Sequence, residues 1–291
     1  MDSQERGHAI SQRGRVPTWL ILSLGAAALF IGAEVLGERM YEEGRFEIEL
    51  DRVLIEGRSE HAYIPIAWSE FVAAELSGMK DSVFSDDPEA AARVVAKLEA
   101  LPMIRSVEAT RMIIPDGLEV EVRLRRVVAC VKAGGGFLPV SEDGVILPGF
   151  SVSPMSDGVD AAPLIAWDES LKDLSVGDEL SLEQHFDALS VALSMQRHLS
   201  SPEVRVLLGA IRIDASGAAL ASVTHPGVVV YLPEHRAALF GRPPLHAYSG
   251  EMPDKLKWAH LSKYLLEPSS GEGEWEILDI RWDDADVLLR R

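Results

Sequence analysis

The stretch LPMIRSVEATRMIIPDGLEVEVRLRRVVACV, residues 101–131, decides how the first folded part of this chain is built. The residues from Ile104 to Ile114 predict a strand, and Pro115-Asp116-Gly117 supplies a turn. In the returning half, apolar residues alternate with charged ones, so one face can enter a core while the other meets water. The stretch therefore predicts a β-hairpin whose buried face consists of Leu118, Val120, Val122 and Leu124.

Two helices and a strand are predicted before this hairpin. The segment SDDPEAAARVVAKLEALP, residues 85–102, has Asp86 or Asp87 as N-cap and Pro88 at the first helical position. Another helix is predicted over residues 64–76, where apolar residues recur at helical spacing, and a strand over residues 46–55. The order strand, helix, helix, strand, strand indicates an α+β domain.

This order and several local motifs resemble the POTRA domain of the FtsQ/DivIB cell-division family. The family's Leu-Pro pair, strand Arg, Pro-x-x-Leu and basic pair are matched here by Leu101-Pro102, Arg111, Pro115, Leu118 and Arg125-Arg126. The resemblance implies a POTRA domain with the order β-α-α-β-β over residues 45–126.

Residues 127–291 predict a second unit of mixed α/β structure. A helix is expected over residues 181–199, and strands are expected over residues 209–213, 219–224 and 227–232, separated by turn residues. A further helix follows in PDKLKWAHLSKYLL, residues 253–266. Near the end, Asp279-Ile280-Arg281-Trp282 is similar to the Asp-Leu-Arg-Tyr of the same family. The resemblance implies the family's C-terminal β domain over residues 127–291.

The residues from Pro17 to Ala33 include no ionisable side chain and predict a membrane anchor. Arginines precede this run and glutamates crowd its far side, so we expect the N-terminus in the cytoplasm. The predicted arrangement is a cytoplasmic tail over residues 1–16 and a transmembrane helix over residues 17–36. Everything after it would be extracytoplasmic or periplasmic, in a single-pass protein of the inner membrane at the division septum. The alternative is a cleaved signal peptide, because Ala26 and Ala28 form an A-x-A pair.

Composition argues against several classes of function. The formal net charge of −18 would repel nucleic acid, and Cys130, the single cysteine, excludes an intrachain disulfide. The eight histidines show no metal-ligand spacing. Gly134 to Gly136 reads as a turn and not as a phosphate-binding loop. We therefore expect no catalytic residue, no cofactor, no metal site and no small-molecule substrate.

The resemblance implies a divisome scaffold, not an enzyme. Such a protein links early and late division proteins, binds FtsB-like and FtsL-like partners, and through them controls septal peptidoglycan synthesis. The expected mechanism is β-augmentation, in which a partner segment adds to a late strand at a sheet edge. By motif, the partner-binding strand carries Asp279, Arg281, Trp282 and Asp284.

Three of these residues, Asp279, Arg281 and Trp282, also have structural interpretations. Asp279 and Arg281 are expected to remain outside the core as an exposed charge pair, and Trp282 could equally be a core-facing anchor of the last strand. Two other functions stay open. One is a membrane-anchored extracytoplasmic ligand-binding or enzymatic domain, which would need a pocket with converging polar groups within residues 127–291. The other is a POTRA-containing outer-membrane assembly factor, for which too few residues remain to form a barrel.

Overall fold

The structure is a computed structural model, and it describes most of the chain. The described residues are 18–43, 45, 47–48, 54–58, 72, 74, 76, 83–84, 89–113, 117–149, 151, 162–166, 171, 173–199, 210–247, 250–266, 275–283 and 286–289.

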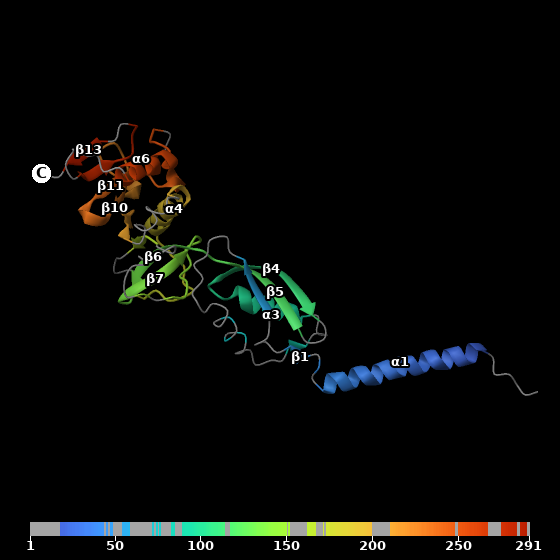
Figure 1. Cartoon of the computed structure of the whole chain (residues 1–291). Helices are drawn as coiled ribbons and strands as arrows, with labels where there is room; N and C mark the ends of the chain where they lie inside the picture. The colour runs from blue at the N-terminus through green and yellow to red at the C-terminus, as the bar shows by residue number, and fades with distance from the viewer. Residues whose placement is uncertain are drawn as a thin grey trace, which may run out of the picture.

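Helix α1, Thr18–Glu42, contains the apolar run on which the expected membrane anchor rested (Figure 1). Within the described part of the chain, no helix has both the length and the apolar character needed to cross a membrane. Glu34, Glu38 and Arg39 stand inside α1, so its uncharged part ends at Ala33, short of the roughly 20 residues that a helical span needs. The expected fold class with a transmembrane helix over residues 17–36, and the expected single-pass location in the inner membrane, are therefore wrong.

Two small sheets follow α1. Strand β1, Glu47–Ile48, pairs antiparallel with β3, Val83–Phe84. A three-stranded sheet has the order β2-β5-β4, in which β5 is parallel to β2 and antiparallel to β4. The pairing of β4 with β5 confirms the predicted hairpin. The strands of this sheet are β2, Leu54–Arg58, β4, Ile104–Ile113, and β5, Gly117–Leu124.

Helix α3, Ala90–Glu99, covers the three-stranded sheet and closes the first core. Val94 and Leu98 on this helix are fully buried in one cluster with the alternate residues of β5. Because the pleat sends successive side chains to opposite faces, the charged residues of β5 point away from this cluster. The predicted buried face is confirmed for Leu118, Val120, Val122 and Leu124.

After the three-stranded sheet, the chain forms an eight-stranded sheet with the order β13-β12-β11-β10-β9-β8-β6-β7 (Figure 1). Three neighbouring strands, β9, β8 and β6, run parallel next to β7 at one end of the sheet, and β11 is parallel to β12. The remaining pairs are antiparallel. The strands are β6, Val127–Ala133, β7, Gly136–Ser141, β8, Leu164–Ala166, β9, Arg212–Asp214, β10, Val228–Tyr231, β11, Ala237–Gly241, β12, Trp275–Asp279, and β13, Asp286–Leu289.

Two helices, α4, Glu183–His198, and α6, Asp254–Leu266, pack against this sheet and against each other. Helix α4 connects β8 to the parallel strand β9, as in a βαβ unit. On α6, the buried ring of Trp258 lies 5.0 Å from the ring of Phe240 on β11. The indole N–H of Trp258 donates to Ser194 on α4 at 2.9 Å, so this buried polar group is satisfied. The second core therefore lies between these helices and the sheet.

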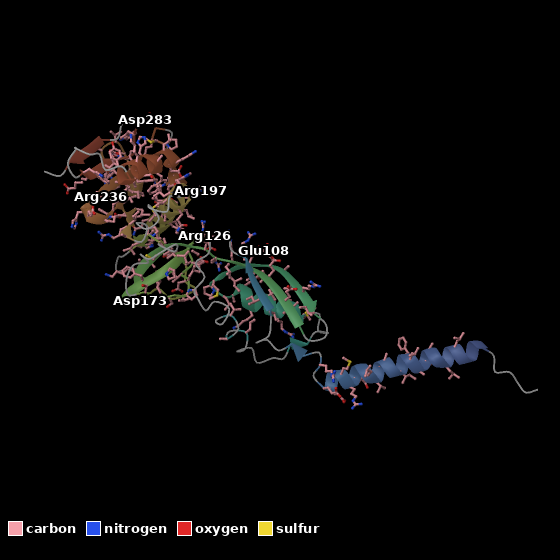
Figure 2. The ribbon with its side chains drawn as sticks, in the orientation of Figure 1. Glu108, Arg126, Asp173, Arg197, Arg236 and Asp283 are labelled. Carbon is pink, nitrogen blue, oxygen red and sulfur yellow. The ribbon has the colours of Figure 1, made fainter. Side chains whose placement is uncertain are left out.

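The two cores share no residue, and ion pairs hold them together where the chain passes from one to the other. Arg125 at this junction donates to the Asp143 carboxylate at 2.9 Å and to the carbonyl of Pro102 at 2.9 Å. Arg126, labelled in Figure 2, donates its backbone N–H to Glu142 at 3.1 Å. Arg105 of β4 also pairs with Glu142. The turn after β7 is thereby tied to the end of the three-stranded sheet.

The carboxylate of Asp143 is held in its charged form at this junction. Burial alone would raise its pKa, but hydrogen bonds from the hydroxyl of Ser141 and from Arg125 outweigh it, so the pKa lies below the ordinary 3.8. A carboxyl group with a lowered pKa in the folded state stabilises the fold above its unfolded-state pKa. That contribution is lost as the pH falls through the folded-state value.

Replacing Asp143 with Asn should lower the free energy of unfolding at pH 7 by about 1 kcal/mol, because Asn cannot pair with Arg125. The difference from the parent protein should shrink as the pH falls below 3.8, where the parent begins to lose the same carboxylate. Urea unfolding at a series of pH values measures both effects. The control is Asp173→Asn at an exposed position, labelled in Figure 2, and equal effects of the two substitutions at pH 7 would contradict this role of Asp143.

Candidate functional site

The residues predicted to bind a partner lie at the end of β12 and just after it. Asp279 is the last residue of this strand, Arg281 and Trp282 follow it, and Asp284 lies outside the described residues. Strand β12 pairs with β11 on one side and with β13 on the other. The expectation that this late strand forms the sheet edge is therefore wrong, because residues 286–289 return and cover it. The edge belongs to β13.

Arg281 is buried, with only 6% of its surface exposed, and it makes the central contacts of this region. Its Nη2 donates to Oδ2 of Asp279 at 2.6 Å, and its Nε donates to Oδ1 at 2.9 Å. Its Nη1 donates to the backbone carbonyls of Ser222 and His225 at 2.8 and 3.1 Å. The expectation that Arg281 forms an exposed charge pair is wrong, since backbone carbonyls from a distant loop enclose its guanidinium.

The ion pair also sets the electrostatics of the site. The hydrogen bond with Asp279 raises the pKa of Arg281 further above its usual value, despite the opposing effect of burial. The guanidinium carbon lies 5.5 Å from the centre of the Trp282 ring, which is half-buried. Trp282 thus packs against the ion pair with part of its ring exposed. It is neither a fully buried anchor of the last strand nor a fully exposed contact residue.

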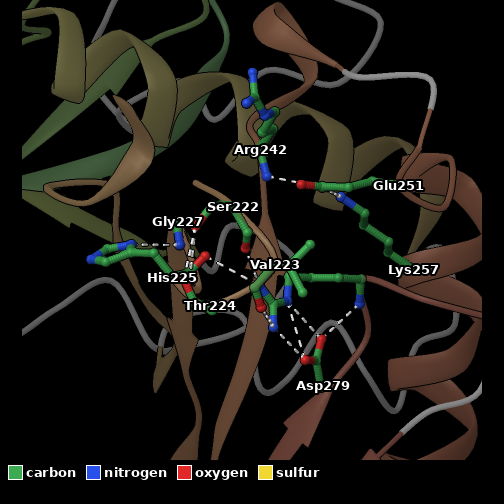
Figure 3. A network of polar contacts seen from close by, with 10 residues as sticks. Ser222, Val223, Thr224, His225, Gly227, Arg242, Glu251, Lys257 and Asp279 are labelled. Carbon is green, nitrogen blue, oxygen red and sulfur yellow. Dashed lines mark hydrogen bonds and ion pairs between the residues drawn. The ribbon is translucent and has the colours of Figure 1, made fainter. Parts of the chain in front are cut away.

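The loop that Arg281 holds was predicted to be a strand over residues 219–224, and that prediction is wrong. A 3-10 turn, Ala218–Leu220, and a tight bend take its place. Ser222 N–H donates to the carbonyl of His225 at 3.1 Å, and Gly227 N–H donates to Nδ1 of His225 at 3.2 Å. Figure 3 shows the carbonyls of this loop facing the side of the network where Asp279 lies. In place of strand pairing, Ser222 and Val223 offer their carbonyls to Arg281.

A second buried ion pair lies beside the first (Figure 3). Nζ of Lys257 donates to Glu251 at 2.7 Å, and the same carboxylate accepts the backbone N–H of Arg242 at 3.0 Å. Burial lowers the pKa of Lys257 below its usual value, against the effect of Glu251. Gly241 has a φ of +90°, and a side chain there would collide with Glu251. The network therefore leaves no room for a larger residue at the end of β11.

Two hollows in the large sheet bear on the alternative of a ligand-binding or enzymatic domain. A groove of about 690 Å³ runs beside the turn between β10 and β11, next to Tyr231 and Arg236. A smaller hollow of about 220 Å³ is lined by Gln184, His185, Asp214 and Ser216. Asp214 accepts the backbone N–H of Ser216 at 2.9 Å, so its carboxylate closes its own turn.

The sequence did not predict that these side chains meet, because they come from α4 and from the end of β9. Their convergence depends on the crossover between β8 and β9. Among the described residues, no three His, Cys, Asp or Glu side chains are grouped so that they could hold a metal ion.

Comparison with known proteins adds no relative: no protein-family model matches the sequence, and no curated protein does. The resemblance to the FtsQ/DivIB family therefore rests on the motifs of residues 101–131 and 279–282.

Replacing Arg281 with Lys should lower the free energy of unfolding by about 2 kcal/mol, because Lys keeps the charge but cannot reach Asp279 and the loop carbonyls together. The backbone amides of residues 222–227 should exchange hydrogen faster. Denaturant unfolding and hydrogen exchange by mass spectrometry measure the two effects. Arg197→Lys on the exposed side of α4 is the matched control (Figure 2). Unchanged exchange in the loop would show that Arg281 does not hold it.

Proposed function

We propose that this chain is a non-enzymatic division scaffold that resembles the FtsQ/DivIB proteins. It binds FtsB-like and FtsL-like division proteins and acts on septal peptidoglycan synthesis through them. In this proposal residues 45–126 are the POTRA domain and residues 127–291 are the β domain. The observation that carries the proposal is the open edge of the eight-stranded sheet at β13.

Strand β13 pairs with β12 on one side only, among the strands that the structure describes. The register joins Leu278 to Val287 and Ile277 to Leu288. Alternate backbone N–H and C=O groups of β13 therefore point away from the sheet, where a partner strand can accept and donate hydrogen bonds. This is the geometry that β-augmentation requires.

The opposite end of the same sheet is less open. The last strand there is β7, and backbone bridges join its Phe137 to Ser151 and its Val140 to Ile146. The N–H of Phe137 donates to the carbonyl of Ser151 at 2.8 Å, and the reverse bond is 3.0 Å long. These contacts occupy part of the outer side of β7. An added strand therefore has better access to β13, the strand that follows the Asp-Ile-Arg-Trp motif.

Proline substitutions in β13 test the proposal. Neighbouring N–H groups of a strand point to opposite sides, so one of Val287→Pro and Leu288→Pro removes a bond to β12 and the other removes an outward donor. The outward variant should keep the melting temperature and bind the FtsB-like protein of the source organism at least tenfold more weakly. The inward variant should mainly lower the melting temperature. Affinity is measured by titration of the purified proteins.

Depletion in growing cells tests the biological role independently. Cells should form filaments because division fails, and the parent sequence should restore division while the outward proline variant should not. The proposal is abandoned if the parent protein does not bind the FtsB-like protein, or if depleted cells divide normally. An unchanged affinity in both proline variants would remove β13 from the binding site.

A further inference from the structure

The loop held by Arg281 exposes two large apolar side chains. Leu220 is 64% exposed and Val223 is 75% exposed. We call these two residues the apolar knob. A single exposed apolar residue needs no explanation, because much of any protein surface is apolar. The knob differs because of how firmly its backbone is held.

The backbone of the knob is fixed from several sides. The backbone N–H of Ser222 donates to the carbonyl of His225, and the hydroxyl oxygen of Ser222 accepts the backbone N–H of His225, each at 3.1 Å. Nη2 of Arg242 donates to the carbonyl of Ala221 at 3.2 Å. Arg281 holds the carbonyls of Ser222 and His225, as described above. A loop ordered in this way loses little further entropy when a partner covers it.

The shape of this loop depends on a buried ion pair, and its small apolar residues Ala218 and Ala221 are buried, whereas Leu220 and Val223 remain exposed. Ordering a backbone costs conformational entropy, and burying a guanidinium adds a desolvation cost. The packing of Ala218 and Ala221 offsets part of these costs, but Leu220 and Val223 stay exposed. The arrangement is suited to presenting Leu220 and Val223 to another molecule in a fixed geometry.

The knob lies at the end of the sheet where β13 begins. Asp279 pairs in register with Asp286, the first residue of that strand, and the carboxylate of Asp279 holds the guanidinium that binds the loop. The loop that carries the knob is therefore connected to the open edge by the ion pair between Arg281 and Asp279 and by the pairing of Asp279 with Asp286. A segment that adds to β13 and continues past Asp286 leaves the sheet at the end where the knob lies.

Charge near the knob restricts the partner. Asp283 is exposed and follows Trp282, whose ring packs against Arg281 (Figure 2). The carboxylate of Asp279 already forms an ion pair with Arg281, whereas Asp283 is exposed to water. In a chain with a net charge of −18, a basic side chain is favoured beside this position.

We infer that the apolar knob is a second docking point for the segment that adds to β13, and that it takes a large apolar side chain flanked by a basic residue. This inference rests on the proposed function, since the same partner contacts both places. Main-chain pairing along β13 supplies affinity without choosing a sequence. The knob and Asp283 supply specificity for the partner, because they contact side chains just beyond the added strand.

The test compares Val223→Ser with Val176→Ser in the full chain. Val176 is also exposed, at 45%, but it lies in the turn before α4. Val223→Ser should raise the Kd for the FtsB-like protein about tenfold, the loss expected for one buried valine, and Leu220→Ser should act in the same direction. Val176→Ser should leave the Kd unchanged. All three variants should keep the parent melting temperature.

Asp283→Lys supplies a second readout. It should weaken binding, and the parent protein should lose affinity as the salt concentration rises, since an exposed charge contact is screened. Binding by the parent with no loss in Val223→Ser and Leu220→Ser would overturn the inference and leave the edge of β13 as the whole site. No binding by the parent would instead refute the proposed function. Weaker binding in both serine variants, with no effect of Asp283→Lys, would overturn the basic flank alone.

Discussion

The end of the large sheet depends on one buried interaction, the ion pair between Arg281 and Asp279. A guanidinium has five N–H groups and cannot lose its charge inside a protein, so burial is tolerated only where every donor finds an acceptor. Here Asp279 accepts from Nε and Nη2, and carbonyls of the loop at residues 222–225 accept the rest. Two segments far apart in the chain become one unit: the end of β12 with the residues directly after it, and the loop before β10.

That unit lies at the open side of an asymmetric sheet. Helices α4 and α6 pack against the sheet, and bridges from Ile146 and Ser151 occupy part of the outer side of β7. Strand β13 is short and is bonded on one side among the described strands. An open edge is an aggregation risk unless something limits its pairing, and shortness is one way that proteins limit it. The same edge gives a partner strand a place to bind.

The junction between the two cores is also held by ion pairs, but their side chains are less buried than those of Arg281 and Asp279. Arg125 and Arg126 belong to the link itself, while Glu142 and Asp143 belong to the turn after β7. Because the two cores share no buried residue, these contacts and the direct chain connection fix how the small sheet meets the large one. Exposed ion pairs contribute little individually, but several in one place can restrict a hinge.

The sequence by itself determined the local elements: the hairpin over β4 and β5, the helices α3, α4 and α6, and the alternation that buries Val120 and Val122. These depend on periodicity, turn residues and helix ends, which act over a few residues. The prediction of a membrane-spanning helix from the apolar run of α1 was wrong, since Glu34 and Glu38 belong to the same helix. Only the tertiary structure decided that Arg281 is buried, that residues 219–224 form no strand and that β13 is the edge. Each depends on hydrogen-bond partners distant in sequence or on a strand that folds back, and a local pattern does not contain that information.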